Sequence, residues 1–253
     1  MFRFPVTYFA GRFSRLSGAA ALAALAAVAA GAGPAAAAVA GGSAAASAAP
    51  LFSYVGEAYY ATSRGASAVL PVADPRLAPQ ANHSLAELAV ESSNGRDIIE
   101  TGWVHSQGIA GGPRLFVSYW AGGVDHVDAG FRSTSRTGRP FEALRPGASA
   151  RFEVAYASGR WIVSYRGRQL GYFPASLWAG RFRSAAVTQA FGEVESYGPS
   201  RTQMIDGRAD RAISGFHLIG GRTPAGRFYA STAEGYYLGA HGGGWFRLGG
   251  SGR

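Results

Sequence analysis

The sequence RWIVSYRGRQLGY, residues 160–172, decides the class of fold. Two short runs rich in apolar, aromatic and β-branched side chains lie on either side of a central Arg-Gly-Arg turn at residues 166–168. Such runs are typical of β-strands, and a short glycine-containing turn between two of them predicts a β-hairpin. We therefore expect antiparallel strands in this part of the chain.

The same rhythm of short apolar runs and turns continues along the chain after residue 50. Gly, Pro, Asn and Ser separate the runs, which predicts strands joined by turns. The strands are expected at residues 54–60, 66–72, 98–104, 114–120, 150–156, 161–165, 169–172, 185–194, 212–219 and 228–237. We expect an all-β fold: an antiparallel two-sheet β-sandwich of the jelly-roll or lectin-like kind, formed by residues 52–253.

Three further segments are less regular. Residues 84–92 fit either a strand or a short helix, and residues 174–181 fit one or two helical turns. The C-terminal residues 235–253 are rich in glycine and aromatic side chains. Because aromatic side chains bury large apolar areas, we expect this tail to pack on the sandwich.

Residues 1–45 have the layout of a secretory signal peptide with an Ala/Gly-rich leader. Arginines precede an apolar run at residues 19–30, and Ala38 and Ala40 offer a small-residue cleavage site. The run is short and alanine-rich for a membrane span. We expect a secreted protein, extracellular or in the cell envelope, without stable membrane insertion after cleavage; an uncleaved anchor is the alternative.

The composition limits the classes of molecule that the protein can be expected to bind. The formal net charge is +9, yet the basic residues, all of them arginine, are scattered rather than gathered in a stripe. Nucleic-acid binding favours a basic stripe or patch, so we expect no nucleic-acid partner. The chain has no cysteine, which excludes disulfides and thiol chemistry.

Two glutamates lie inside predicted strands, where carboxylates are uncommon. Glu100 belongs to DIIETGWV, residues 97–104, and Glu193 belongs to VTQAFGEV, residues 187–194. An ionised side chain that is buried must change its pKa, find a partner or serve a function. From the residues alone, pairing with one of the arginines and acid/base catalysis both remain open. The adjacent Gly102 and Gly192 would let a substrate backbone come close.

The order of motifs around the two glutamates resembles that of the neprosin family of secreted peptidases. In that family a Glu-x-Gly-Trp strand, a Phe-Thr-Tyr-Trp strand, a Gly-Tyr-Trp-Pro turn, a Gly-Gly-Glu strand and a Thr-Gln-Met segment follow one another, and this chain has similar segments in the same order. They occupy residues 99–104, 114–120, 170–174, 189–194 and 202–204.

The resemblance implies a β-sandwich glutamic endopeptidase that hydrolyses polypeptides, with plant members cleaving after proline. Carried over by motif, the catalytic dyad falls on Glu100 and Glu193, and the enzyme needs no metal or other cofactor. One ionised carboxylate would activate water and one protonated carboxyl would polarise the scissile carbonyl, so activity should peak at acidic pH. We expect Trp103, Tyr119, Trp120 and Gln189 to line the peptide groove.

The chain also departs from the family. The cysteine pair of plant members is missing, and no propeptide is evident between the leader and the domain. The usual Gly-Gly before the second acid reads Phe191-Gly192, and Asp206 introduces an acid after the Thr-Gln-Met segment.

Two other functions stay open on the residues. Glu193 and Glu195 share a strand face, as the carboxyls of a glycoside hydrolase can. A non-catalytic carbohydrate- or peptide-binding sandwich is the second alternative. The histidines lack metal-ligand spacing, and His126 between Asp125 and Asp128 fits a surface loop better than a metal site.

Overall fold

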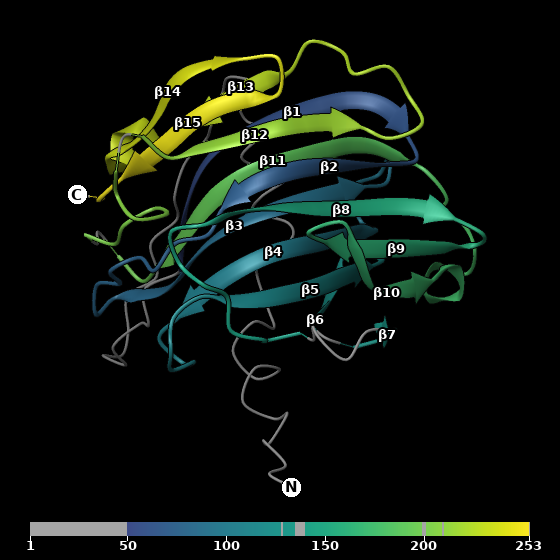
Figure 1. Cartoon of the computed structure of the whole chain (residues 1–253), viewed down its shortest axis with the longest axis horizontal. Helices are drawn as coiled ribbons and strands as arrows, with labels where there is room; N and C mark the ends of the chain where they lie inside the picture. The colour runs from purple at the N-terminus through teal and green to yellow at the C-terminus, as the bar shows by residue number, and fades with distance from the viewer. Residues whose placement is uncertain (1–49, 128, 135–139, 199–200, 209, 253) are drawn as a thin grey trace, which may run out of the picture.

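The computed structural model describes residues 50–252 except 128, 135–139, 199–200 and 209. The leader at residues 1–45, with its proposed cleavage site, lies outside the described residues. Two antiparallel sheets pack face to face as a sandwich (Figure 1), as the sequence predicted.

One sheet has seven strands in the order β13-β1-β11-β3-β4-β5-β6. Their bounds are β1 Leu51–Ser63, β3 Ala81–Glu91, β4 Ile98–Ser106, β5 Arg114–Ala121, β6 Val124–Val127, β11 Ala185–Ser196 and β13 Arg227–Ala230.

The other sheet has eight strands in the order β14-β15-β12-β2-β8-β9-β10-β7. Their bounds are β2 Gly65–Pro71, β7 Arg132–Ser133, β8 Ser149–Ala157, β9 Arg160–Tyr165, β10 Arg168–Pro174, β12 Ala212–Leu218, β14 Tyr236–Gly242 and β15 Trp245–Gly250. Two short 3-10 helices, η2 Ala175–Trp178 and η3 Thr232–Glu234, complete the described elements. Within the described residues, no helix is long and apolar enough to cross a membrane.

The hairpin predicted at residues 160–172 is confirmed as β9 and β10. Arg166 and Gly167 both have positive φ, 52° and 74°, as a two-residue type I′ turn requires. This turn matches the right-handed twist of paired strands, which explains why so short a connection is stable.

The segment at residues 84–92, which fits either a strand or a helix, forms part of strand β3 as far as Glu91, at the centre of the seven-stranded sheet. Ala86, Leu88 and Val90 are fully buried in the core between the sheets. The alternate residues face the other side of the sheet, where Leu85 and Ala89 belong to a separate apolar cluster and Glu87 and Glu91 are also buried. A strand buried on both faces loses the simple apolar–polar alternation, which is why its sequence was ambiguous.

The expectation of one strand at residues 228–237 is wrong. The chain leaves the seven-stranded sheet after β13, turns through η3 and enters the eight-stranded sheet as β14. Gly235 ends η3 with φ 88°, a left-handed conformation that favours glycine. The aromatic tail does pack on the sandwich, because Phe246 and Leu248 of β15 are fully buried.

The glycine of the Glu-x-Gly-Trp motif has a packing role. A Cβ on Gly102 would lie 2.1 Å from the backbone oxygen of Ala86 on the adjacent strand. Gly192 is also required by packing, because a Cβ there would meet Leu248 at 2.8 Å and Met204 at 3.1 Å. Both contacts lie within the protein, so neither glycine serves mainly to admit a substrate backbone.

We expect Gly102→Ala to destabilise the protein by about 1–3 kcal/mol, the usual cost of overpacking, because the new methyl group meets rigid backbone. Gly192→Ala should cost less, because Leu248 and Met204 can shift their side chains. Urea unfolding of both variants and the wild type measures the difference. A larger loss in Gly192→Ala would contradict this account of the motif.

Candidate active site

The sheet register places Glu100 and Glu193 on the same face of the seven-stranded sheet. Glu100 of β4 pairs with Ala89 of β3, and Glu193 of β11 pairs with Leu85 of the same strand. Glu87 lies between these positions on β3, so each step from Glu100 to Glu87 to Glu193 joins diagonal neighbours. Such neighbours on adjacent strands are about 7–8 Å apart. The face points away from the core between the sheets, as its separate apolar cluster shows.

Further carboxyl groups lie close to this row. We call this surface the acidic face and define it by Glu87, Glu91, Glu100, Asp125 and Glu193. Aliphatic and aromatic side chains of β3, β4, β5 and β11 surround the carboxyls: Leu85, Ala89, Ile98, Val104, Phe116, Trp120 and Phe191. The surroundings are therefore poor in water, and they favour neutral over ionised carboxyls.

Glu87 lies in the middle of the acidic face, between Glu100 and Glu193. It is only 4% exposed. Burial raises its pKa well above the ordinary value, and the charges of Glu100, Glu193, Glu91 and Asp125 raise it further. Glu87 therefore keeps its proton where an exposed glutamate would lose it.

Glu100 has one polar contact that orients it. The indole Nε1 of Trp120 donates a hydrogen bond to Glu100 Oε2 at 2.9 Å. Burial, and then the charge of Asp125, raise the pKa of Glu100 to about 8, against the lowering effect of the Trp120 hydrogen bond. Glu100 is thus a carboxylic acid at acidic and neutral pH.

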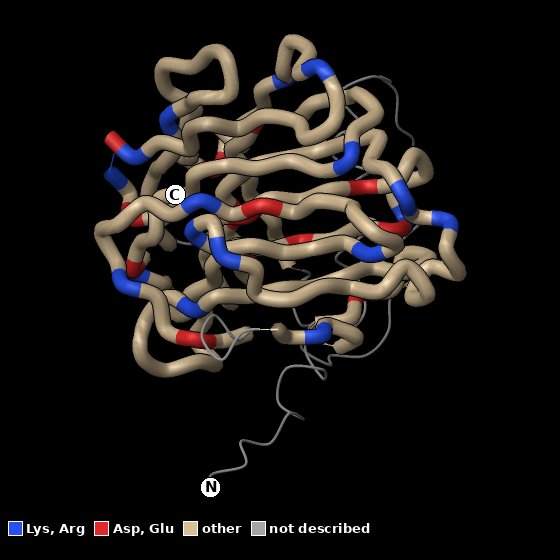
Figure 2. The backbone as a smooth tube through the Cα atoms, turned by 45° about the vertical axis from the view of Figure 1, so that its right-hand side comes forward, with Lys and Arg blue, Asp and Glu red and all other residues tan. Residues whose placement is uncertain are grey.

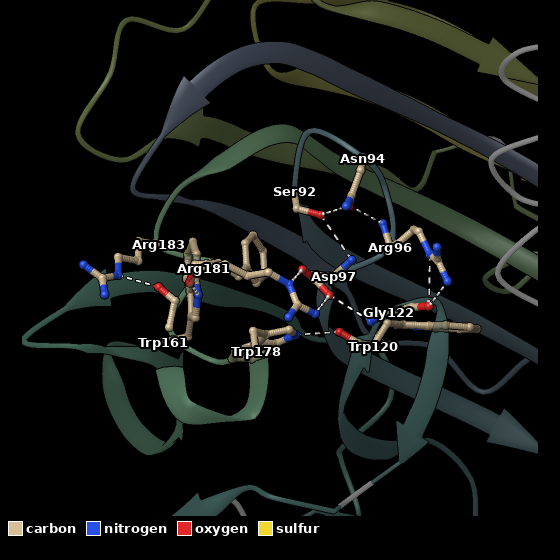
Figure 3. A network of polar contacts seen from close by, with 12 residues as sticks. Ser92, Asn94, Arg96, Asp97, Trp120, Gly122, Trp161, Trp178, Arg181 and Arg183 are labelled. Atoms are coloured by element: carbon tan, nitrogen blue, oxygen red, sulfur yellow. Dashed lines mark hydrogen bonds and ion pairs between the residues drawn. The ribbon is translucent and has the colours of Figure 1, made fainter.

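A polar network holds Trp120 in position (Figure 3). Trp178 Nε1 donates to the backbone oxygen of Trp120 at 2.6 Å. Nearby, the buried Asp97 pairs with Arg181 at 3.0 Å and accepts a hydrogen bond from the backbone nitrogen of Gly122. The loop that follows β5 is therefore tied to the segment that precedes β4, which supports the orientation of the Trp120 indole.

Glu193 has different surroundings. Its Oε1 lies 2.7 Å from Nε2 of His83, a residue of β3 that is 2% exposed. Burial by itself lowers the pKa of His83, but the hydrogen bonds and charges of Glu193 and Glu195 outweigh it and raise the pKa to about 9. A cation therefore faces Glu193, whereas Glu100 faces other carboxyls.

Gln189 lies on the acidic face, directly across Ala89 from Glu100. Its amide nitrogen donates to Glu91 Oε1, and its oxygen accepts a hydrogen bond from Tyr229 Oη at 2.9 Å. Both ends of the Gln189 amide are thus held by protein groups. Of the four residues expected to line the groove, Gln189 and Trp120 share the face of the two glutamates.

Trp103 and Tyr119 do not share that face, and the expectation for them is corrected. Trp103 is fully buried in the core and donates a hydrogen bond to the backbone oxygen of Pro71 at 2.7 Å. Tyr119 packs between the sheets against Phe173 and Trp178. Odd-numbered residues of β4 and β5 face the core and even-numbered ones face outward, so strand alternation separates these aromatics from Glu100.

Pairing with arginine does not account for the two glutamates. Within the described part of the chain, the ion pairs of arginine are Arg181–Asp97, Arg208–Asp210 and Arg211–Asp206. The last of these also shows that Asp206 is neutralised by Arg211 rather than directed at the acidic face. Figure 2 shows the arginines spread over strands and loops in that view; the absence of a nucleic-acid partner stays a prediction.

Sequence reasoning missed Glu87, His83 and Asp125 as members of the site. Glu87 and His83 lie in and beside the segment whose secondary structure was ambiguous, so their face could not be assigned. Asp125 was placed in a surface loop, but it lies in β6, where it accepts a hydrogen bond from Ser118 Oγ at 2.8 Å. His126 faces the other way and stacks on Tyr119. No group of three or more potential ligands among the described residues could hold a metal ion.

Comparison with known proteins gives one family match. The Neprosin family profile matches residues 80–216, the segment that contains β3, β4, β5 and β11. A search of curated proteins finds no significant match.

Solved structures of low sequence identity also resemble the chain. Scytalidoglutamic peptidase with a transition-state analogue inhibitor has 10% identity and a TM-score of 0.49, over 79% of this chain and 98% of that one. SCP-B, a member of the eqolisin family of peptidases in complex with a tripeptide, has 9% identity and a TM-score of 0.44 over the same shares.

The acidic face predicts how stability depends on pH. A carboxyl with a raised folded-state pKa contributes stability that is present below its unfolded pKa and lost as pH rises toward the folded one. For Glu100 this window runs from 4.5 to about 8. For His83, also raised, it runs from 6.5 to about 9. Both effects make the protein less stable as pH rises from 5 to 9.

We therefore expect the melting temperature to fall over this range, and to fall less in Glu87→Gln and Glu100→Gln, which remove an ionisable group. Calorimetry at several pH values measures the slopes, with Glu153→Gln on β8 of the other sheet as the matched control. Equal slopes in all four proteins would show that the acidic face does not retain its protons.

Proposed function

The chain belongs to the neprosin family of peptidases, and on that premise we propose that it is a secreted, acid-active glutamic endopeptidase with Glu100 and Glu193 as its catalytic dyad. The observation that carries the proposal is that the two glutamates share one sheet face but have opposite electrostatic surroundings. Glu100, among carboxyls, has a pKa of about 8, whereas Glu193 contacts a histidine cation. Pairs with such unlike environments are typical of acid/base catalysis.

The two roles follow from these environments. Glu193 acts as the base that takes a proton from water, and the water oxygen attacks the carbonyl carbon of the scissile peptide bond. Glu100, protonated, donates a hydrogen bond to the carbonyl oxygen and then gives its proton to the leaving amine. The proton on Glu193 returns to Glu100 when the products leave. One water is consumed, and one carboxyl and one amine are formed.

The aromatic and aliphatic rim of the acidic face is suited to a polypeptide. Trp120, Phe116 and Phe191 lie beside the dyad and are 7–8% exposed, and aromatic rings stack well on proline. We include cleavage after proline in the proposal, on the resemblance to plant members of the family. The glycoside hydrolase alternative is weakened because His83 and Asn82 already hold Glu195.

Substitution of the dyad tests the proposal. Glu100→Gln and Glu193→Gln should fold, because glutamine keeps the size of the side chain, but each should lose at least about 10²-fold in kcat/KM, the lower end of what acid/base groups contribute. Hydrolysis of a denatured protein substrate at pH 4 measures the loss, with Glu153→Gln as the control. Full activity in either dyad variant would refute the assignment.

Specificity and pH range need a separate experiment. A peptide-library digest at about pH 3–5, which brackets ordinary carboxyl pKa values, should yield fragments that end in proline. Cleavage that does not depend on proline would still show peptidase activity, but it would refute the proposed preference for proline. Binding of peptides without any cleavage by the wild type would favour the non-catalytic sandwich instead.

A further inference from the structure

His83 joins two glutamates of strand β11. Its Nε2 lies 2.7 Å from Glu193 Oε1 and its Nδ1 lies 3.1 Å from Glu195 Oε2. The register explains the geometry, because His83 pairs directly with Glu195 and Glu193 is its diagonal neighbour on the same face. Asn82 Nδ2 donates to Glu195 Oε2 at 2.7 Å and ends the chain of contacts.

Only a doubly protonated ring can donate toward both carboxylates. Neutral imidazole has one N–H and one acceptor nitrogen, whereas the imidazolium has two donors. The ring is buried, and the side chains of Glu193 and Glu195 are only 13% and 7% exposed. Water therefore has little access to these contacts, which makes them stronger than surface ion pairs.

The contact also helps to orient the Glu193 carboxylate. His83 holds its Oε1, and Tyr54, directly opposite Glu193 on β1, is a second hydrogen-bond partner of the same carboxylate. A general base must be held within hydrogen-bond reach of the attacking water, so the orientation of its carboxylate matters directly. Glu195 acts one step further away, because it holds the opposite nitrogen of the imidazole.

We infer that His83 is a positioning residue for peptide hydrolysis, a buried cation that fixes the carboxylate of Glu193, and that Glu195 holds His83 in turn. The inference rests on the proposed role of Glu193 as the base. It gives a function to Glu195 that needs no contact with substrate.

The contacts of His83 with Glu193 and Glu195, which we call the clamp, also affect how activity depends on pH. The titratable groups that face His83 are Glu193 and Glu195 from β11, while β4 presents Ser106, which does not titrate in this range. Removal of the Glu195 charge lowers the pKa of His83, because an adjacent opposite charge favours the imidazolium. The cation beside Glu193 is then lost at lower pH than in the wild type, and activity falls with it.

The first measurement is kinetic. We expect His83→Gln to lose about 10²-fold in kcat with little change in KM, because a misplaced catalytic group costs about that much. Glu195→Gln should keep more kcat at pH 4 but lose activity at a lower pH than the wild type. His217→Gln, which changes an exposed histidine of β12 in the other sheet, is the matched control and should match the wild type.

The second measurement does not depend on activity. ¹⁵N NMR of the histidine rings follows protonation, with His83 assigned by its loss in His83→Gln. The His83 ring should stay doubly protonated to about pH 9 in the wild type and lose its proton at lower pH in Glu195→Gln.

The outcomes separate the inference from the proposed function. If the His83→Gln protein folds and has the kcat of the wild type, the positioning role of His83 is refuted, but the proposed peptidase activity is not. If His83→Gln fails to fold, an unchanged His83 titration and pH profile in Glu195→Gln would overturn the positioning role. A wild type without peptidase activity, or an active Glu193→Gln, would instead refute the proposed function, and with it the catalytic role of the clamp.

Discussion

The burial of several carboxyl groups on one face of a β-sheet is the constraint on which the site depends. Ionised carboxylates in apolar surroundings repel one another and lose their hydration, so such a face can exist only with protons or counter-charges. This protein uses both. Glu87 and Glu100 keep their protons, as their raised pKa values indicate, and Glu193 lies against the cation of His83.

Strand β3 makes this arrangement possible because it is the middle strand between the two that carry the proposed dyad. Its inner face supplies small and aliphatic side chains to the sandwich core, and its outer face supplies Glu87 and His83. At one end of the site, burial and the charge of Asp125 on β6 raise the proton affinity of Glu100. At the other end, His83 of β3 provides positive charge beside Glu193. The two glutamates therefore have unlike environments, which an acid/base pair requires.

Strand alternation also places neighbouring aromatic residues on opposite faces of the sheet. Trp120 reaches outward to Glu100, and its backbone is held by Trp178. Trp103, only one residue away from the motif glycine, points inward and fills the core. The Glu-x-Gly-Trp motif thus combines three separate requirements: an outward carboxyl, a close approach of two backbones at Gly102, and a large core side chain.

The sequence by itself determined the all-β class, the turn of the β9–β10 hairpin, and the family to which the order of motifs belongs. These depend on local periodicity, turn chemistry and motif order, which can be read along the chain. Only the tertiary structure decided that Glu87 and His83 join the two glutamates, and that Trp103 and Tyr119 do not. The partners of a residue on adjacent strands depend on sheet order and register, and β3, which links the two sides of the site, has no periodicity that reveals its faces because both are buried.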